Sequence, residues 1–123
     1  MAGKIIAAGA AFAGIGVALG AFGAHGLKDR LTPDLLEIYQ TAVQYQFYHS
    51  FGLILLGLFV AQRGEVSGAG AAAWAFSIGI LLFSGSLYVL ALTGAKWLGA
   101  ITPLGGLAFL VGWGLFVWAA IKS

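Results

Sequence analysis

Apolar residues fill four long stretches of this chain, and charged residues stand almost only between them. A helix needs about 20 residues to cross the ~30 Å hydrocarbon core of a bilayer, and each stretch is about that long. Backbone groups find no water inside lipid, so a chain of this length spans it as helices. The expected spans cover residues 5–24, 43–61, 69–92 and 99–121. The pattern predicts an all-α integral membrane four-helix bundle, forming one transmembrane domain over residues 1–123.

The first stretch follows a lysine, as the apolar part of a secretory signal peptide does. Such apolar parts contain about 7–15 residues, and this stretch is longer. We therefore expect the first stretch to remain as a span rather than to be cleaved.

A polar segment, residues 25–42, separates the first two spans. Within it, Thr32, Pro33 and Asp34 have the order of an N-cap, a first helical residue and an acid that favours the helix dipole. Polar residues then fall mostly on one side of the predicted helix and apolar residues on the other. This pattern predicts an interfacial helical segment before the second span. Periodicity does not distinguish a separate amphipathic helix from one long helix that leaves the membrane.

Composition supports the membrane assignment and excludes several functions. Only 8% of the residues are charged, against about 25% in soluble domains. The six basic residues are scattered singly, whereas nucleic-acid binding needs a clustered basic face. The chain has no cysteine, which removes thiolate nucleophiles and cysteine-based metal sites. We expect no metal, no cofactor and no catalytic residue, because no phosphate loop, dinucleotide fingerprint or metal-binding helix motif is present.

Glycine makes up 20 of the 123 residues, and in an apolar chain it favours close helix packing. Gly16 and Gly20 are four residues apart on the first span, and Gly112 lies on the fourth. We predict that these residues pack helices within the chain; a homo-oligomer is the alternative if their faces point outward.

Four spans place both chain termini on one side of the membrane. Lys4, Arg63 and Lys122 then lie on that side, and the other three basic residues, Lys28, Arg30 and Lys96, on the opposite side. The positive-inside rule gives a tie. Acidic residues are more frequent on the second side, which favours cytoplasmic termini. Lys28, Arg30 and Lys96 are candidate contacts for lipid headgroups.

Polar side chains gather in the half of the bundle where the first span ends and the second begins. His49 is the most informative, since an ionisable residue inside a span is costly and usually faces the bundle interior. It is either a hydrogen-bonding strut between helices or a ligand-binding or proton-relay residue. The candidate ligand-binding residues are His25, Gln44, Tyr45, Tyr48, His49, Ser84 and Tyr88.

Several segments resemble the YgdD-type family of small membrane proteins. The segments are residues 20–27 (GAFGAHGL), 41–50 (TAVQYQFYHS), 83–88 (FSGSLY), 92–94 (LTG) and 101–106 (ITPLGG). These proteins belong to the bacterial inner membrane, with mitochondrial relatives, and form a domain of unknown function. The resemblance implies a four-span membrane protein and brings no activity, cofactor or catalytic residue with it. Gln44 stands where that family often has arginine, which argues against a mechanism that needs a cation beside His49.

Three functions follow from these patterns. The first is a non-enzymatic membrane protein that associates with membrane lipid, with a larger membrane complex or with itself. The second is a binder of a small amphiphile, such as a lipid headgroup or quinone, around His49. The third is passage of protons or small solutes, which the lack of polar residues in the other half of the bundle disfavours.

Overall fold

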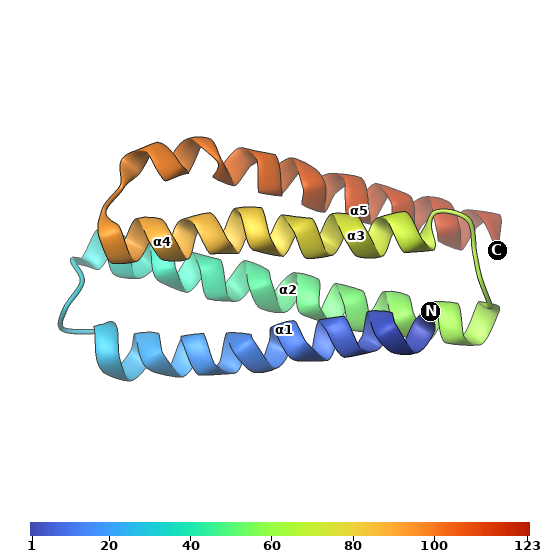
Figure 1. Ribbon diagram of the computed structural model, residues 1–123, viewed down its shortest axis with the longest axis horizontal. Coiled ribbons are helices and arrows are strands. Elements are labelled where there is room, and N and C mark those ends of the chain that lie inside the picture. Colours follow the sequence, from blue (N-terminus) through green and yellow to red (C-terminus); the bar gives the residue numbers. More distant parts are fainter.

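A computed structural model describes all 123 residues, and the chain forms four long helical rods lying side by side (Figure 1). Each rod is long and apolar enough to cross a membrane. The first rod is α1 (Ala2–Phe22) and the π-helical turn η1 (Gly23–Leu27), and the second is α2 (Pro33–Arg63). The third joins α3 (Ala69–Gly79), the π-helical turn η2 (Ile80–Ser84) and α4 (Gly85–Thr93). The fourth follows the short 3₁₀ helix η3 (Lys96–Ala100) and is α5 (Thr102–Lys122).

Residues 33–42 of the polar segment form the beginning of α2, so the chain adopts the single long helix of the two alternatives. The Thr32 side chain accepts a hydrogen bond from the Leu35 backbone N–H at 3.3 Å, and Pro33 occupies the first turn. No glycine or proline interrupts the sequence between Pro33 and the apolar core of the span. The helix ends at Gly64, whose φ of 80° is favourable only for glycine. Because α2 starts this early, His49 lies near the middle of the helix.

The rods pack in an open order rather than as a closed square. α1 packs along α2, α2 packs on α3, η2 and α4, and α5 packs on α3 and η2. Both chain termini and the α2–α3 loop lie at one end, here called the terminal end (Figure 1). The α1–α2 loop and the α4–α5 connection lie at the other, here called the hairpin end (Figure 1).

Glycines allow the closest approaches between rods. A Cβ added to Gly9 would lie 2.7 Å from the Ser50 backbone oxygen. The three glycines singled out from the sequence also face neighbouring helices: Gly16 faces the Phe47 ring, Gly20 faces Val43, and Gly112 faces the Phe76 ring. The structure therefore places all three in contacts within one chain.

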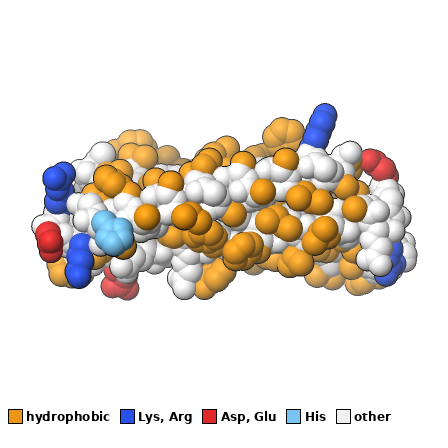
Figure 2. Space-filling model, turned by 90° about the horizontal axis from the view of Figure 1, so that it is seen from below, with side chains coloured by type: hydrophobic (Ala, Val, Ile, Leu, Met, Phe, Trp, Pro, Cys, Tyr) orange, Lys and Arg blue, Asp and Glu red, His pale blue; other side chains and the backbone are white.

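The outer surface is arranged as a membrane requires. Charged side chains gather at the two ends, and hydrophobic side chains cover the middle (Figure 2). Exposed Trp74 lies in α3, in the first half of the third rod, and exposed Trp118 near the end of α5, both toward the terminal end, and exposed Trp97 lies in η3 at the hairpin end. This is the placement of an aromatic belt.

Candidate functional site: a polar network in the hairpin half

His49 joins α2 to α5 from a buried position. The Trp113 indole Nε1–H donates a hydrogen bond to His49 Nε2 at 3.0 Å. An indole nitrogen only donates, so Nε2 carries no proton and the imidazole is neutral. His49 Nδ1–H then donates to the Tyr45 backbone oxygen at 2.7 Å. The Phe109 ring stacks on the imidazole with 3.4 Å between ring centres, so both nitrogens and one face are occupied by the protein itself.

Gln46 joins three rods. Its amide Nε2–H donates to the Phe12 backbone oxygen at 2.7 Å, and its Oε1 accepts from the Tyr88 hydroxyl at 2.6 Å. The candidates predicted from the sequence include Gln44 but not Gln46. The spacing of Tyr39, Gln46 and His49 along one helix face is the signal that could have found Gln46.

Further hydrogen bonds connect the rods between His49 and the hairpin end. The Tyr39 hydroxyl donates to the Leu19 backbone oxygen at 2.6 Å. The Ser84 hydroxyl, at the end of η2, donates to the Ala42 backbone oxygen at 2.7 Å. Ser86 and Thr102 share a hydroxyl–hydroxyl bond of 2.7 Å between α4 and α5. Every buried side-chain nitrogen and oxygen has a partner, so these groups form a complete structural network.

The structure brings only some of the candidate residues together. His49, Ser84 and Tyr88 belong to the network, whereas Gln44 and Tyr48 are exposed. Tyr45 is partly exposed, and its ring lies against Phe83 with 4.7 Å between ring centres. The remaining candidates are exposed at the hairpin end: His25, Lys28, Arg30 and Lys96.

The network stops at the level of His49. Toward the terminal end the core is apolar, and the one polar side chain among α3 residues, Ser77, bonds to the Ala73 oxygen of its own helix at 2.9 Å. A buried apolar cluster extends toward that end from Phe109, which stacks on His49. Its other members are Ile5, Leu53, Leu56, Val60, Ala69, Ala72, Phe76 and Ile80. No chain of polar groups crosses this half.

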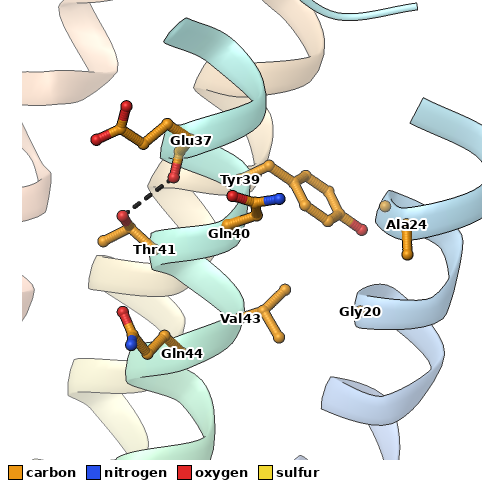
Figure 3. Close-up of a pocket in the computed structure, with 9 residues that line it drawn as sticks. Gly20, Ala24, Glu37, Tyr39, Gln40, Thr41, Val43 and Gln44 are labelled. Atoms are coloured by element: carbon orange, nitrogen blue, oxygen red, sulfur yellow. Dashed lines mark hydrogen bonds between the residues drawn. The ribbon is translucent and has the colours of Figure 1, made fainter. Parts of the chain in front are cut away.

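Two hollows on the outer surface lie beside the network. The α2–α5 groove has a volume of about 420 Å³, and His49 lies at its wall. Its lining consists of Tyr45, Tyr48, His49, Phe83, Gly106, Phe109, Leu110 and Trp113. The α1–α2 pocket, nearer the hairpin end, has a volume of about 490 Å³ (Figure 3). Its lining consists of Gly20, Gly23, Ala24, Glu37, Tyr39, Gln40, Thr41, Val43 and Gln44.

Residues 19–106 match the family described as "Protein of unknown function (DUF423)". The chain belongs to this family. It is 45% identical over 114 residues to the UPF0382 membrane protein YwdK of Bacillus subtilis, an alignment that covers 93% of each chain. It is 47% identical over 115 residues to a UPF0382 membrane protein of Staphylococcus epidermidis, covering 93% of this chain and 92% of the relative. No solved structure matches the chain.

Membership in DUF423 agrees with the four apolar rods: the protein is an integral membrane protein of uncharacterised activity. The matched residues include every segment on which the sequence resemblance rested, from residue 20 to residue 106. The expectation of an uncharacterised membrane family is therefore confirmed.

Proposed function

We propose that this DUF423 protein is not an enzyme and acts by association, through its outer surface, with membrane lipid or with a larger membrane complex. The observation that carries the proposal is the closed hydrogen bonding of His49, the one ionisable side chain near the middle of the bundle. Trp113 and the Tyr45 backbone take both of its nitrogens. Since no buried polar atom lacks a partner, the interior offers no free group to act on a substrate.

The outer surface supports association. α1 packs mainly on α2, and its remaining faces expose Ile15, Val17 and Phe22, each more than half exposed. On the other edge of the array, α5 exposes Leu110 and Val117 in the same way. In a membrane such faces are covered either by acyl chains or by another helix.

A second candidate is amphiphile binding in the α2–α5 groove. The groove is within the usual size of ligand pockets, about 300–1,000 Å³, and its aromatic wall includes the edge of His49. A quinone-like ring or an acyl chain fits such a lining. Passage of protons or solutes has less support, because the terminal half of the core contains only apolar contacts between rods.

We also propose the finer assignments that the sequence suggested. The DUF423 family and the YgdD-type family are taken to be the same, and the protein to reside in the bacterial inner (cell) membrane with both termini in the cytoplasm. The acids Asp29, Asp34 and Glu37 at the hairpin end favour this orientation. The chain has no cysteine, so single variants Asp29→Cys and Ser67→Cys report it directly. A membrane-impermeant maleimide should label Asp29→Cys in intact cells and Ser67→Cys only after permeabilisation; the reverse pattern would invert the topology.

Association is tested by extracting the protein with its surrounding lipid in copolymer discs and identifying what stays bound by native mass spectrometry. We expect bound lipid or a protein partner, and the same set on a Trp113→Phe variant, which leaves His49 Nε2 without its donor. Trp97→Phe, at an exposed indole, is the matched control. A small molecule held by the wild type and lost only from Trp113→Phe would favour the groove instead. Release of all lipid and protein on mild detergent exchange would contradict association.

A further inference from the structure

Two tyrosines line the α2–α5 groove with hydroxyl groups that have no partner in the chain. Tyr45 and Tyr48 are 37% and 50% exposed, and their rings meet edge to face with 5.5 Å between ring centres. The hydroxyls of Tyr39 and Tyr88 donate hydrogen bonds of 2.6 Å to other rods. None of the side-chain hydrogen bonds within the chain involves the hydroxyl of Tyr45 or Tyr48. Two tyrosines therefore hold rods together, and the two at the groove keep free donors.

The groove lies at the middle of the membrane. The charged ends of the first rod, Lys4 and Lys28, are about 36 Å apart at about 1.5 Å per residue, so the middle of the hydrocarbon core is near Gly16. Gly16 faces the Phe47 ring, and Phe47 lies between the two groove tyrosines in the sequence. On the opposite wall, Trp113 is next to the middle residue of α5. Both helices thus give the groove the same depth.

Ordinary lipids offer these two hydroxyls no acceptor at this depth. Phospholipid ester groups lie at the edge of the hydrocarbon core, about 15 Å from its middle for a core of ~30 Å, and a tyrosine side chain is shorter than that distance. Water is absent from the core. A hydroxyl without a partner in apolar surroundings is costly, so the two phenols need an acceptor that is itself soluble in hydrocarbon.

The other walls of the groove fit a flat ring. The Tyr45 ring lies against Phe83 with 4.7 Å between ring centres, and it is within 24° of parallel to the Phe109 ring. Gly106 leaves space beside them, since a Cβ added there would meet only the Phe83 ring, at 3.9 Å. Aromatic walls stack well on another flat ring. An acyl chain would also fill the space, but it carries no acceptor at this depth.

We propose that the α2–α5 groove binds a lipid-soluble ring with carbonyl groups, of the quinone class, and that Tyr45 and Tyr48 donate hydrogen bonds to its carbonyl oxygens. This inference rests on amphiphile binding in the groove, the second candidate function above, and names the ligand. The ring lies against Phe83 and Phe109, and an apolar tail leaves through the open side of the groove into lipid. His49 donates nothing to the ligand, because both of its nitrogens have partners within the chain. The interaction is binding alone, with no electron transfer to the ring.

The test uses two probes that differ only in their carbonyl groups, 2-methyl-1,4-naphthoquinone and 2-methylnaphthalene. Trp74→Phe, Trp97→Phe and Trp118→Phe together leave Trp113, at the groove, as the one tryptophan; all three replaced side chains are exposed. In lipid nanodiscs we expect the quinone to quench Trp113 fluorescence in a saturable way. The methylnaphthalene should compete about 25-fold more weakly, the effect of two neutral hydrogen bonds.

Two further variants of this single-tryptophan protein test the donors. Tyr45→Phe and Tyr48→Phe each remove one hydroxyl and keep the ring. Each should weaken quinone binding about fivefold, the effect of one neutral hydrogen bond, and leave competition by methylnaphthalene unchanged. Equal losses for both probes would overturn the proposed hydrogen bonds to the ligand.

A glycine pair tests the location. Gly106→Leu fills the groove, so only the linear quenching by quinone dissolved in the lipid should remain. Gly114→Leu makes the same change on the same helix, at a glycine with nothing within 4 Å of an added Cβ, and should behave as the parent protein. Circular dichroism and the thermal midpoint check that each variant is folded. Saturable binding that persists in Gly106→Leu would overturn the location.

The remaining outcomes separate this inference from the proposed function. Equal affinity for the two probes would overturn the quinone assignment and leave an apolar groove that accepts acyl chains. Absence of saturable quenching in the parent protein would overturn ligand binding in the groove altogether. Bound lipid or a protein partner in native mass spectra would still support association in either case, and their complete release would contradict association whatever the probes do.

Discussion

Trp113 and His49 hold α5 and α2 together through one 3.0 Å hydrogen bond, although α2 packs mainly on α1 and α5 packs mainly on α3. The bond fixes the imidazole in its neutral form with the proton on Nδ1. Both partners of this bond line the α2–α5 groove on the outer surface. We propose that His49 is a strut between helices, because Trp113 and the Tyr45 backbone occupy both of its ring nitrogens.

Removing either partner of the His49–Trp113 hydrogen bond should lower the stability of the protein. We expect His49→Phe and Trp113→Phe each to reduce the free energy of unfolding by about 1–2 kcal/mol, because each leaves a polar group without its partner. A double-mutant cycle should give a coupling of about 0.6–1.7 kcal/mol, the range for hydrogen bonds in membrane proteins. Unfolding in mixed detergent micelles measures it, with Trp97→Phe as the control. Additive losses would contradict a direct bond.

Gln46 and Gln44 provide a second comparison, since the two residues are close in sequence and differ in burial. Gln46→Leu removes the link from α2 to both Phe12 and Tyr88 and strands a tyrosine hydroxyl, so we expect a loss of about 2–3 kcal/mol. Gln44→Leu should change stability by less than about 0.5 kcal/mol, as surface substitutions do. Thermal midpoints in one detergent check both, and equal losses would argue against the network.

The close contact between Gly9 and the backbone of α2 leads to a third prediction. An alanine Cβ there would lie 2.7 Å from the Ser50 oxygen, so α1 must move away from α2. We expect Gly9→Ala to cost about 1–3 kcal/mol, the typical effect of overpacking. Gly14 has nothing within 4 Å of the same position, and Gly14→Ala should be neutral or slightly stabilising. A tolerated Gly9→Ala would mean that the two helices are further apart in lipid.

Ser84 and Ser77 allow a hydrogen bond between two helices to be compared with a hydrogen bond inside one helix. Ser84 donates to Ala42 on α2, whereas Ser77 donates to its own helix. Ser84→Ala should destabilise the protein by about 0.6 kcal/mol, the average for membrane hydrogen bonds between helices, and Ser77→Ala by less. Reversible unfolding in micelles resolves this difference if both variants are measured in parallel.

The sequence predicted the four rods because their lengths and apolar character follow from the bilayer thickness alone. It also located the polar half, since the threading of four spans places the end of the first rod beside the start of the second. These features depend on position along the chain and on little else.

The partners within the polar half were not predictable in the same way. Which side chain faces which helix depends on the rotation of each rod, and the π-helical turn η2 alters that rotation just before Ser84. The choice of Gln44 over Gln46 shows the consequence, because residues two positions apart on a helix point to different faces. The continuation of α2 through residues 33–42 was likewise one of two alternatives that periodicity left open.

Nitrogen NMR of the His49 ring reports directly on the His49–Trp113 hydrogen bond, because this bond requires a proton on Nδ1 and an acceptor at Nε2. In ¹⁵N-histidine-labelled protein reconstituted in lipid, His25→Gln leaves His49 as the one histidine. We expect a neutral imidazole with a protonated Nδ1 and an unprotonated Nε2, and loss of the Nε2 hydrogen-bond shift in Trp113→Phe. A protonated Nε2, or a charged ring, would contradict it.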